Sequence, residues 1–144
     1  VTSGYENNSE ANEASFVNGW FKTGDEGFFD NEGYLKISGR IKEIINKGGE
    51  KISPLEVDNV LMFHPLIEQV VCFGFKDKML GEDIAAAIVI EKDKICTELN
   101  IKQYAQEKLA KFKIPKKIFF VDEIPKGSTG KLQRIGLAKK FGLE

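Results

Sequence analysis

The sequence predicts an α+β fold in which a small sheet is flanked by helices. Two continuous apolar runs, at residues 67–75 and 82–91, have the length and composition of buried strands. A helical pattern precedes them at residues 54–64, and a second one follows at residues 97–112. Elements in this order from residue 40 onward are typical of helices packed against one sheet.

The two predicted helices have recognisable start signals. Ser53 and Pro54 suit the N-cap and the first helical position, Pro65 ends the first pattern, and Thr97 can cap the second helix. The side chains expected to face the sheet are apolar and recur at helical spacing: Leu55, Val57, Val60, Leu61 and Phe63 in the first helix, and Leu99, Ile101, Tyr104, Ala105, Leu109 and Phe112 in the second.

The remaining elements are shorter. Residues 1–18 are polar and are predicted to be a linker or an edge piece without a core. The runs "GFFD" and "GYLKIS" are predicted strands, and "DNEG" between them has hairpin-turn chemistry. A third strand is predicted over residues 116–124 and a final helix over residues 132–141.

Composition and charge narrow the class of protein. The net charge is −1, but residues 1–100 carry 10 basic and 18 acidic side chains, whereas residues 101–144 carry 11 and 4. A basic end suits an anionic partner, although a solvated lysine face is the simpler explanation. No apolar run is long enough to span a membrane. Cys72 and Cys96 are too few for a disulfide framework, and we expect both to be reduced.

Several kinds of site are disfavoured. His64, the single histidine, lies at a predicted helix end, where capping or packing is the better interpretation than catalysis. No His/Cys cluster has metal-ligand spacing, so we expect no metal site built by this chain. The basic tail lacks the aromatic–basic pattern of an RNA-binding module, and we expect no nucleic-acid partner.

The stretch "PKGSTGKLQR", residues 125–134, contains a lysine after small residues. A phosphate-binding P-loop would need glycine where Pro125 stands and serine or threonine where Leu132 stands, so that interpretation fails twice. On local chemistry alone Gly127, Ser128, Thr129 and Gly130 would form a mobile surface turn, with Lys131 in solvent.

Three separated motifs change this interpretation. The stretches "WFKTGD" (20–25), "GRIKEIINKGGEKISPLEVD" (39–58) and "PKGSTGKLQR" occur in that order. Together they resemble the last three core motifs of the adenylate-forming superfamily, which includes acyl-CoA synthetases, peptide-synthetase adenylation domains and luciferases. Within it, "VTSGYENNSEANEASF" and "NKGGEKISPLEVD" look similar to the oxalate–CoA ligase, or peroxisomal CoA synthetase-like, group.

The resemblance implies a division of the chain. Residues 1–38 would be the end of a large N-terminal adenylating domain, and residues 39–144 would be the mobile C-terminal lid domain. The motif with which the family grips ATP phosphates and the acyl pocket are missing here. We therefore expect a fragment that is inactive alone and whose partner is its own N-terminal domain.

The resemblance also implies roles for four charged residues. Lys131 would be the catalytic lysine, bridging the substrate carboxylate and the α-phosphate of ATP. Asp25 matches the aspartate that accepts hydrogen bonds from the ribose hydroxyls, and Arg40 matches an arginine that also contacts ribose. Lys42 matches the hinge about which the lid rotates between the two half-reactions.

Three neighbouring residues are implied in the handling of coenzyme A. Gly49 matches the glycine that lets the pantetheine arm pass close to the backbone, and Gly48 corresponds more loosely. Lys51 would meet phosphates of coenzyme A. Asn46 departs from the lysine that several acyl ligases carry, which puts a catalytic role at position 46 in doubt.

The activity implied is that of an AMP-forming acyl-CoA synthetase using ATP, coenzyme A and Mg²⁺, the last held mainly by the absent domain, and a small carboxylic acid as substrate. One alternative is an adenylation domain that loads a carrier protein, and another is a stand-alone regulatory or binding module. The chain ends in "GLE" rather than the peroxisomal signal Ser-Lys-Leu, which favours the cytoplasm over the peroxisome.

Overall fold

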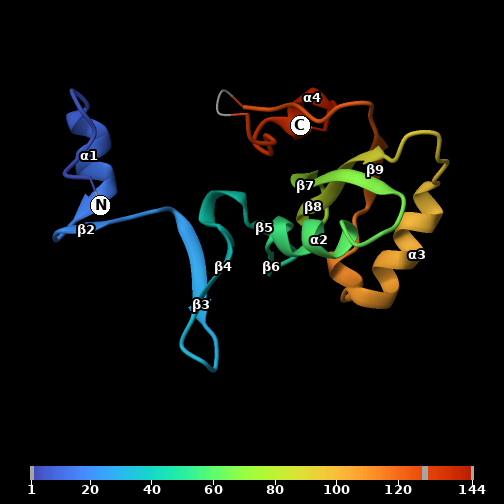
Figure 1. Cartoon of the computed structure of the whole chain (residues 1–144), viewed down its shortest axis with the longest axis horizontal. Helices are drawn as coiled ribbons and strands as arrows, with labels where there is room; N and C mark the ends of the chain where they lie inside the picture. The colour runs from blue at the N-terminus through green and yellow to red at the C-terminus, as the bar shows by residue number, and fades with distance from the viewer. Residues whose placement is uncertain (1, 128–129, 144) are drawn as a thin grey trace. The chain divides into compact units, whose positions relative to one another are not determined.

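The central element of the fold is a mixed sheet in the second part of the chain. The computed structural model describes residues 2–127 and 130–143, and it divides into two units, Val1–Lys42 and Glu43–Glu144. The described strands of the second unit are β5 (Ile45–Lys47), β6 (Glu50–Ile52), β7 (Ile67–Asp77), β8 (Gly81–Ile90) and β9 (Lys117–Phe120). The strand order is β6-β5-β8-β7, and β9 pairs in parallel with β8 (Figure 1). The predicted small sheet with flanking helices is confirmed.

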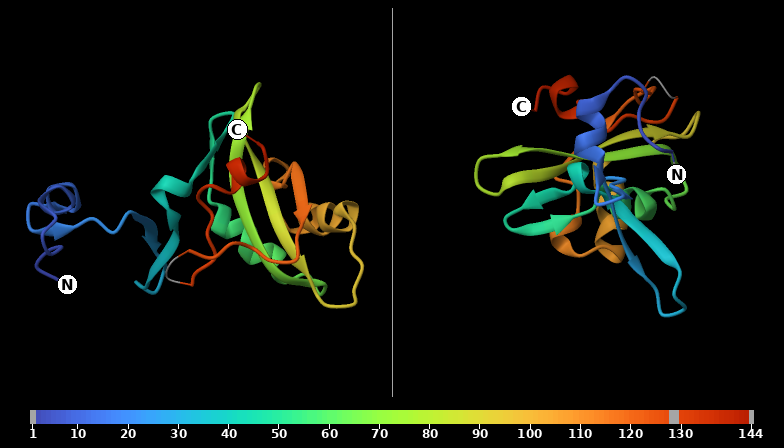
Figure 2. Two further views of the ribbon diagram at one scale, coloured as in Figure 1. Left: turned by 90° about the horizontal axis from the view of Figure 1, so that it is seen from above. Right: turned by 90° about the vertical axis from the view of Figure 1, so that its left-hand side faces the viewer.

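The long antiparallel pair β7–β8 is buried on both faces. Cys72 packs into a core cluster with residues of α2 (Pro54–Leu61) and α3 (Glu98–Lys108). The next residue, Phe73, packs on the other face with Ile124 and Leu137 of the C-terminal segment. Figures 1 and 2 show α2 and α3 on one side of the sheet and this segment on the other. Because successive strand side chains point to opposite faces, burial on both sides explains the continuous apolar runs.

Both predicted helices form, and both are shorter than predicted. α2 ends at Leu61, and the turn that follows is closed by the His64 N–H, which donates to the Leu61 carbonyl at 2.9 Å. Phe63 is 83% exposed, so the expectation that it faces the sheet is wrong. His64 is buried and packs edge-on against Tyr104, which confirms its packing role.

α3 begins after Thr97, whose hydroxyl accepts the Asn100 N–H at 3.2 Å. Ile101 and Ala105 are buried as predicted. Leu99 is 63% exposed, which contradicts the prediction, because two residues turn a helix by about 200° and place it opposite Ile101. Phe112 lies beyond the helix, in a short 3₁₀ turn.

The predicted C-terminal helix is wrong in extent. α4 spans only Leu137–Lys140. Gly136 precedes it with φ 88°, a left-handed conformation that cannot continue a helix. Residues before Gly136 pair backward instead: Leu132 forms a β-bridge with Lys126, and the Gln133 N–H donates to the Pro125 carbonyl at 2.8 Å.

The first unit begins with more secondary structure than predicted. The linker expected over residues 1–18 contains α1 (Ser9–Ser15), capped by the Asn8 side chain, and β1 (Phe16–Val17), which pairs with β2 (Trp20–Phe21). α1 buries none of its residues, so the expected absence of a core in this stretch is confirmed.

The predicted hairpin forms the rest of the first unit. It consists of β3 (Asp25–Phe29) and β4 (Leu35–Arg40), paired antiparallel. The Asp30 carboxylate closes the turn by accepting the N–H groups of Glu32 and Tyr34 at 3.0 and 2.9 Å. The turn chemistry of "DNEG" is thereby confirmed.

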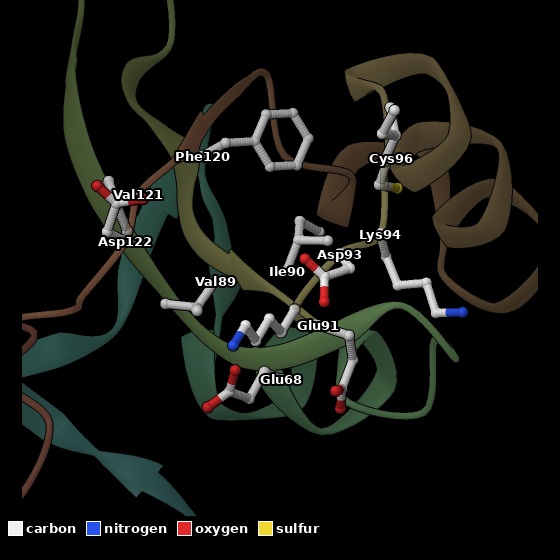
Figure 3. A pocket seen from close by; sticks show the side chains of 12 residues that line it. Glu68, Val89, Ile90, Glu91, Asp93, Lys94, Cys96, Phe120, Val121 and Asp122 are labelled. Carbon is white, nitrogen blue, oxygen red and sulfur yellow. The ribbon is translucent and has the colours of Figure 1, made fainter.

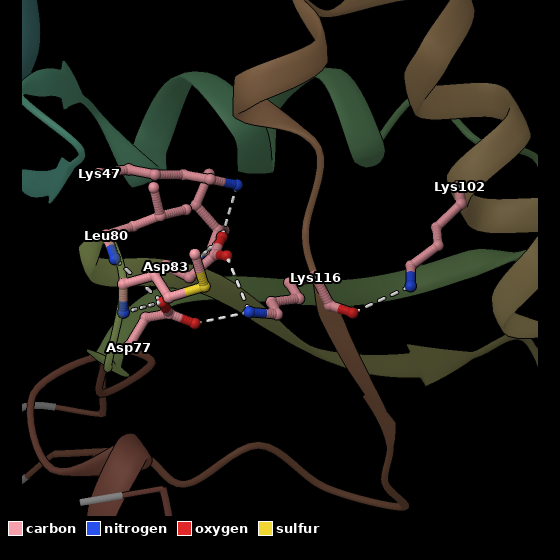
Figure 4. A network of polar contacts seen from close by, with 8 residues as sticks. Lys47, Asp77, Leu80, Asp83, Lys102 and Lys116 are labelled. Carbon is pink, nitrogen blue, oxygen red and sulfur yellow. Dashed lines mark hydrogen bonds and ion pairs between the residues drawn. The ribbon is translucent and has the colours of Figure 1, made fainter.

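Two lysines and two aspartates form an ion-pair network at one end of the sheet (Figure 4). Asp83, which is 2% exposed, lies 2.5 Å from the Lys47 ammonium. Lys116 lies 2.5 Å from Asp77 and 3.6 Å from Asp83. The other Asp77 oxygen accepts the N–H groups of Met79 and Leu80 in the β7–β8 turn. The network therefore connects β5, β8 and Lys116, which directly precedes β9, to the β7–β8 turn.

This network predicts acid-sensitive stability. The hydrogen bond from Lys116 lowers the pKa of Asp77 from 3.8 to about 2. A carboxyl group with a lowered folded-state pKa stabilises the fold above its unfolded pKa and loses that contribution as pH falls toward 2. We therefore expect Asp77→Asn to lower the melting temperature at pH 5–7, and the difference from the wild type to shrink between pH 4 and pH 2. Asparagine keeps the oxygen acceptor for the turn, so the change removes only the charge and the hydrogen bond from Lys116.

Thermal unfolding followed by circular dichroism from pH 2 to pH 7 measures this effect. Asp122→Asn, at an exposed aspartate outside the network, is the control. A constant difference between Asp77→Asn and the wild type over the whole pH range would contradict the prediction.

Candidate functional site

Asp25 and Arg40 are brought together by the β3–β4 hairpin. They are register partners, and the Arg40 Nε lies 3.0 Å from the Asp25 Oδ1. The Thr23 hydroxyl accepts the Asp25 N–H at 3.1 Å, and the Ile41 N–H donates to the Gly24 carbonyl at 2.9 Å. Arg40 therefore orients a carboxylate whose second oxygen accepts no hydrogen bond from any described residue.

Lys42 lies in the 3₁₀ turn Ile41–Glu43 that follows this hairpin. Its side chain is exposed, and the division between the two units falls directly after it. The turn joins the two units of the chain, and a short 3₁₀ turn has few and poorly aligned hydrogen bonds.

Gly48 and Gly49 form the two-residue turn of the β5–β6 hairpin. Their φ angles are +60° and +96°, a combination that favours glycine at both positions. A Cβ on Gly48 would meet the Leu80 side chain at 3.3 Å, whereas a Cβ on Gly49 would meet nothing within 4 Å of it. Gly49 therefore exposes its backbone to any group that approaches the turn.

The residues beside this turn have different roles. The Asn46 side-chain oxygen accepts the Gly49 N–H at 3.1 Å, and the Asn46 N–H donates to Glu82 at 2.7 Å. Asn46 thus stabilises the turn, which fits the doubt about a catalytic role at this position. Lys51, its register partner on β6, is exposed.

Lys131 lies on a small hairpin-like loop near the end of the second unit. Its carbonyl accepts the Gly127 N–H at 2.8 Å, and the Gly130 N–H donates to the Gly127 carbonyl at 2.9 Å. Ser128 and Thr129, which the sequence assigns to the same mobile turn, lie outside the described residues. The Lys131 side chain is exposed, and its ammonium has no ion pair or hydrogen bond with any described residue.

An open pocket of about 440 Å³ lies beside Lys131. Its lining combines one acidic and two basic side chains with the loop itself: Glu43, Gly127, Lys131, Leu132, Gln133, Arg134 and Ile135. An exposed ammonium beside an open, partly apolar pocket can approach a bound anion without first breaking an internal ion pair.

Arg134, the last residue of the third motif, forms a network that we did not predict. Its Nε lies 2.7 Å from Glu43 Oε2, its Nη2 lies 2.9 Å from Asp58 Oδ2, and its Nη1 donates to the Cys72 carbonyl. Asp58 Oδ1 also accepts the Cys72 N–H at 2.6 Å. Asp58 was the sequence signal for this network, because it is a charged residue on the buried face of α2, three positions before Leu61.

Burial and charge act in opposite directions in this network. Burial raises the pKa of Asp58 more than Arg134 lowers it. For Arg134, burial lowers the pKa, but the Asp58 and Glu43 carboxylates outweigh it and raise the pKa overall. The guanidinium therefore stays charged at any pH relevant to the cell.

A larger pocket of about 610 Å³ is lined by residues of β7, β8 and the two segments that follow β8 and β9 (Figure 3). The acidic side chains Glu68, Glu91, Asp93 and Asp122 lie around it. It contains none of the predicted site residues. Across the described ranges, no group of three His, Cys, Asp or Glu residues could hold a metal ion. Nor does any helix in those ranges have the length and apolar character to cross a membrane.

Comparison with known proteins defines the class of this fold. Residues 56–131 match the family described as AMP-binding enzyme C-terminal domain. The structure aligns with o-succinylbenzoate CoA synthetase of Bacillus subtilis in complex with its acyl-adenylate intermediate, with a TM-score of 0.87 and 42% identity over 94% of this chain and 28% of that chain. The chain belongs to the AMP-binding enzyme C-terminal domain family, and it has the fold of that domain in adenylate-forming enzymes.

Curated relatives support the resemblance to the oxalate–CoA ligase group. The oxalate–CoA ligase of Arabidopsis thaliana is 52% identical over 98% of this chain and 27% of its own length. The oxalate–CoA ligase of Saccharomyces cerevisiae is 48% identical over 98% of this chain and 26% of its own length. The chain thus spans about a quarter of the length of these relatives. Of the predicted site residues, Lys131 lies within the family match and the others precede it.

Proposed function

We propose that this chain is the C-terminal part of an ATP-dependent, AMP-forming acyl-CoA synthetase. In this reaction a carboxylic acid is activated as an acyl-adenylate with release of pyrophosphate, and the acyl group is then transferred to coenzyme A with release of AMP. The observation that carries the proposal is the alignment of nearly the whole chain, at about half identity, with oxalate–CoA ligases of a plant and a yeast.

Lys131 is the catalytic residue of this proposal. The first half-reaction brings a carboxylate oxygen to the α-phosphorus of ATP, so two anions meet and negative charge builds between them. An ammonium placed there stabilises that charge. Lys131 suits this role because it is exposed on a short loop and is not held by an ion pair among the described residues.

The other site residues bind the two nucleotide substrates in this proposal. Asp25, oriented by Arg40, accepts hydrogen bonds from the ribose hydroxyls of ATP. The open backbone at Gly49, next to Gly48 in the same turn, admits the pantetheine arm of coenzyme A, and the exposed Lys51 meets its phosphates. Mg²⁺ would accompany ATP and be held mainly outside this chain.

The proposed organisation has residues 1–38 as the end of a large adenylating domain and residues 39–144 as its mobile lid. Lys42 is the proposed hinge, which lets Lys131 leave before the thiol of coenzyme A arrives. Oxalate is the proposed acid, since the two relatives described above are oxalate–CoA ligases. We propose the cytoplasm as the compartment.

A panel of acids tests the proposal. The native-length protein that contains this chain is given Mg²⁺-ATP, coenzyme A and oxalate, acetate, a medium-chain fatty acid or coumarate, and AMP release is measured. Turnover with oxalate above the other acids is the expected result. AMP release with a different acid would keep the synthetase and discard oxalate, and silence with every acid would contradict the proposed activity and favour transfer to a carrier protein.

A further inference from the structure

Arg134 connects the end of the Lys131 loop to three separate elements of the second unit. It lies three residues after Lys131, and its side chain is 14% exposed. It contacts Glu43 at the start of the unit, Asp58 on α2 and the Cys72 carbonyl on β7. Ion pairs with this degree of burial are screened far less by salt than those on an open surface.

The described residues of the loop have few other attachments. Ile124 precedes it and Leu137 follows it, and both are buried in the same core cluster. Between them, Lys126, Lys131 and Leu132 are exposed. The backbone bonds from Gly127 and Gln133 close the loop on itself rather than onto the sheet. The position of the loop relative to the sheet therefore depends strongly on Arg134.

The contact with Glu43 has a further consequence. Glu43 immediately follows Lys42, the proposed hinge, and begins the unit that carries Lys131. Arg134 Nε and Glu43 Oε2 are 2.7 Å apart although 91 residues separate them in sequence. This ion pair thus connects the segment next to Lys42 directly to the base of the Lys131 loop.

We propose that Arg134 is a positioning residue that fixes the Lys131 loop to Glu43 and Asp58, so that Lys131 moves with the segment next to the hinge as one rigid piece. This inference rests on the proposed function, because the position it fixes is that of the adenylating lysine. Arginine is required for geometric reasons: its planar fork reaches Glu43, Asp58 and the Cys72 carbonyl at once, and a lysine ammonium at this site cannot hold all three.

Arg134→Lys in the native-length protein is the first test. The variant keeps the charge beside Asp58 and loses the three-way fork. We expect the rate of adenylate formation to fall about ten- to a hundredfold, the range for loss of a charge-assisted hydrogen bond in a constrained site. The rate of thioester formation from a supplied acyl-adenylate should not change, because Lys131 is not needed there. A fall in kcat larger than the change in KM for ATP separates misplacement of Lys131 from weaker binding.

Two further variants separate positioning from folding. Glu43→Gln removes the charge next to the hinge and leaves the Arg134–Asp58 pair, so it should reproduce part of the Arg134→Lys defect with an unchanged melting temperature. Lys113→Gln removes a different ion pair of α2, that with Glu56 at 2.6 Å, and is the matched control. It should leave both half-reactions at the wild-type rate.

Hydrogen exchange adds a readout that does not need activity. In Arg134→Lys, the amides of residues 126, 127 and 130–135 should exchange faster while those of β7 and β8 stay protected. The inference is overturned if Arg134→Lys loses both half-reactions equally, or if it changes neither adenylate formation nor hydrogen exchange. Turnover by the wild type would still uphold the proposed function in that case.

If the wild type forms no adenylate with any acid, the proposed function fails. Unchanged hydrogen exchange in the loop of Arg134→Lys would then reject the structural role of Arg134 as well.

Discussion

Lys131→Ala is expected to abolish adenylate formation by the native-length protein while thioester formation from a supplied acyl-adenylate is retained. Removing one group that stabilises developing negative charge costs about a hundred- to a thousandfold in rate. The substitution removes an exposed side chain without partners among the described residues, so the fold should be unaffected. Single-turnover formation of acyl-adenylate and conversion of synthetic acyl-adenylate to thioester are the two measurements.

The loop supplies a matched control for this prediction. Lys126 is also exposed, and it faces Leu132 across the same small hairpin. Lys126→Ala removes an equal charge from the opposite leg of the loop and should leave both half-reactions intact. Equal losses in the two half-reactions of Lys131→Ala, or equal defects in the two alanine variants, would contradict the role assigned to Lys131.

Lys42→Pro is expected to impair the half-reaction that requires the lid to rotate and to leave the other largely intact. Proline fixes its own φ near −65° and restricts Ile41 before it, so the chain could no longer change conformation freely at this turn. A penalty of about 3 kcal/mol on one conformation corresponds to a loss on the order of a hundredfold in rate. Separate assays of the two half-reactions measure the effect.

A second proline substitution controls for disruption of the surface. Lys92 is an exposed lysine in the turn after β8, which the Lys94 N–H closes by donating to the Glu91 carbonyl, and it lies beside none of the predicted site residues. Lys92→Pro should leave the ratio of the two half-reaction rates at its wild-type value. An unchanged ratio in Lys42→Pro as well would remove the hinge from the mechanism.

The spacing of apolar residues predicted helices and strands well where burial against the core sets the pattern of a whole segment. The strands β7 and β8 and the helices α2 and α3 have apolar patterns set by burial, and these patterns are local in sequence. The end of the chain was predicted poorly. The apolar residues near Leu137 suggested a helix from residue 132, but Gly136 breaks it and backbone pairing with Lys126 uses the earlier residues.

The candidate site likewise contains residues that the sequence predicted and a network that it did not predict. Lys131, Asp25 and Gly49 were assigned by the resemblance of short, contiguous motifs to the adenylate-forming superfamily, whereas local chemistry alone left Lys131 as a residue of a surface turn. The network of Arg134, Glu43 and Asp58 joins positions 91 and 76 residues apart, and no local pattern encodes which arginine meets which carboxylate. A charged residue on the buried face of a helix indicates that some partner exists. Only the packed structure identifies it.

The most direct measurement is the order of products made by the native-length protein from Mg²⁺-ATP and its acid, with coenzyme A first withheld and then added. Acyl-adenylate and pyrophosphate should form without coenzyme A, and its addition should convert the adenylate to acyl-CoA with one AMP released for each thioester. Acyl-CoA formation with release of ADP and phosphate, or an adenylate that coenzyme A leaves untouched, would contradict a two-step AMP-forming synthetase.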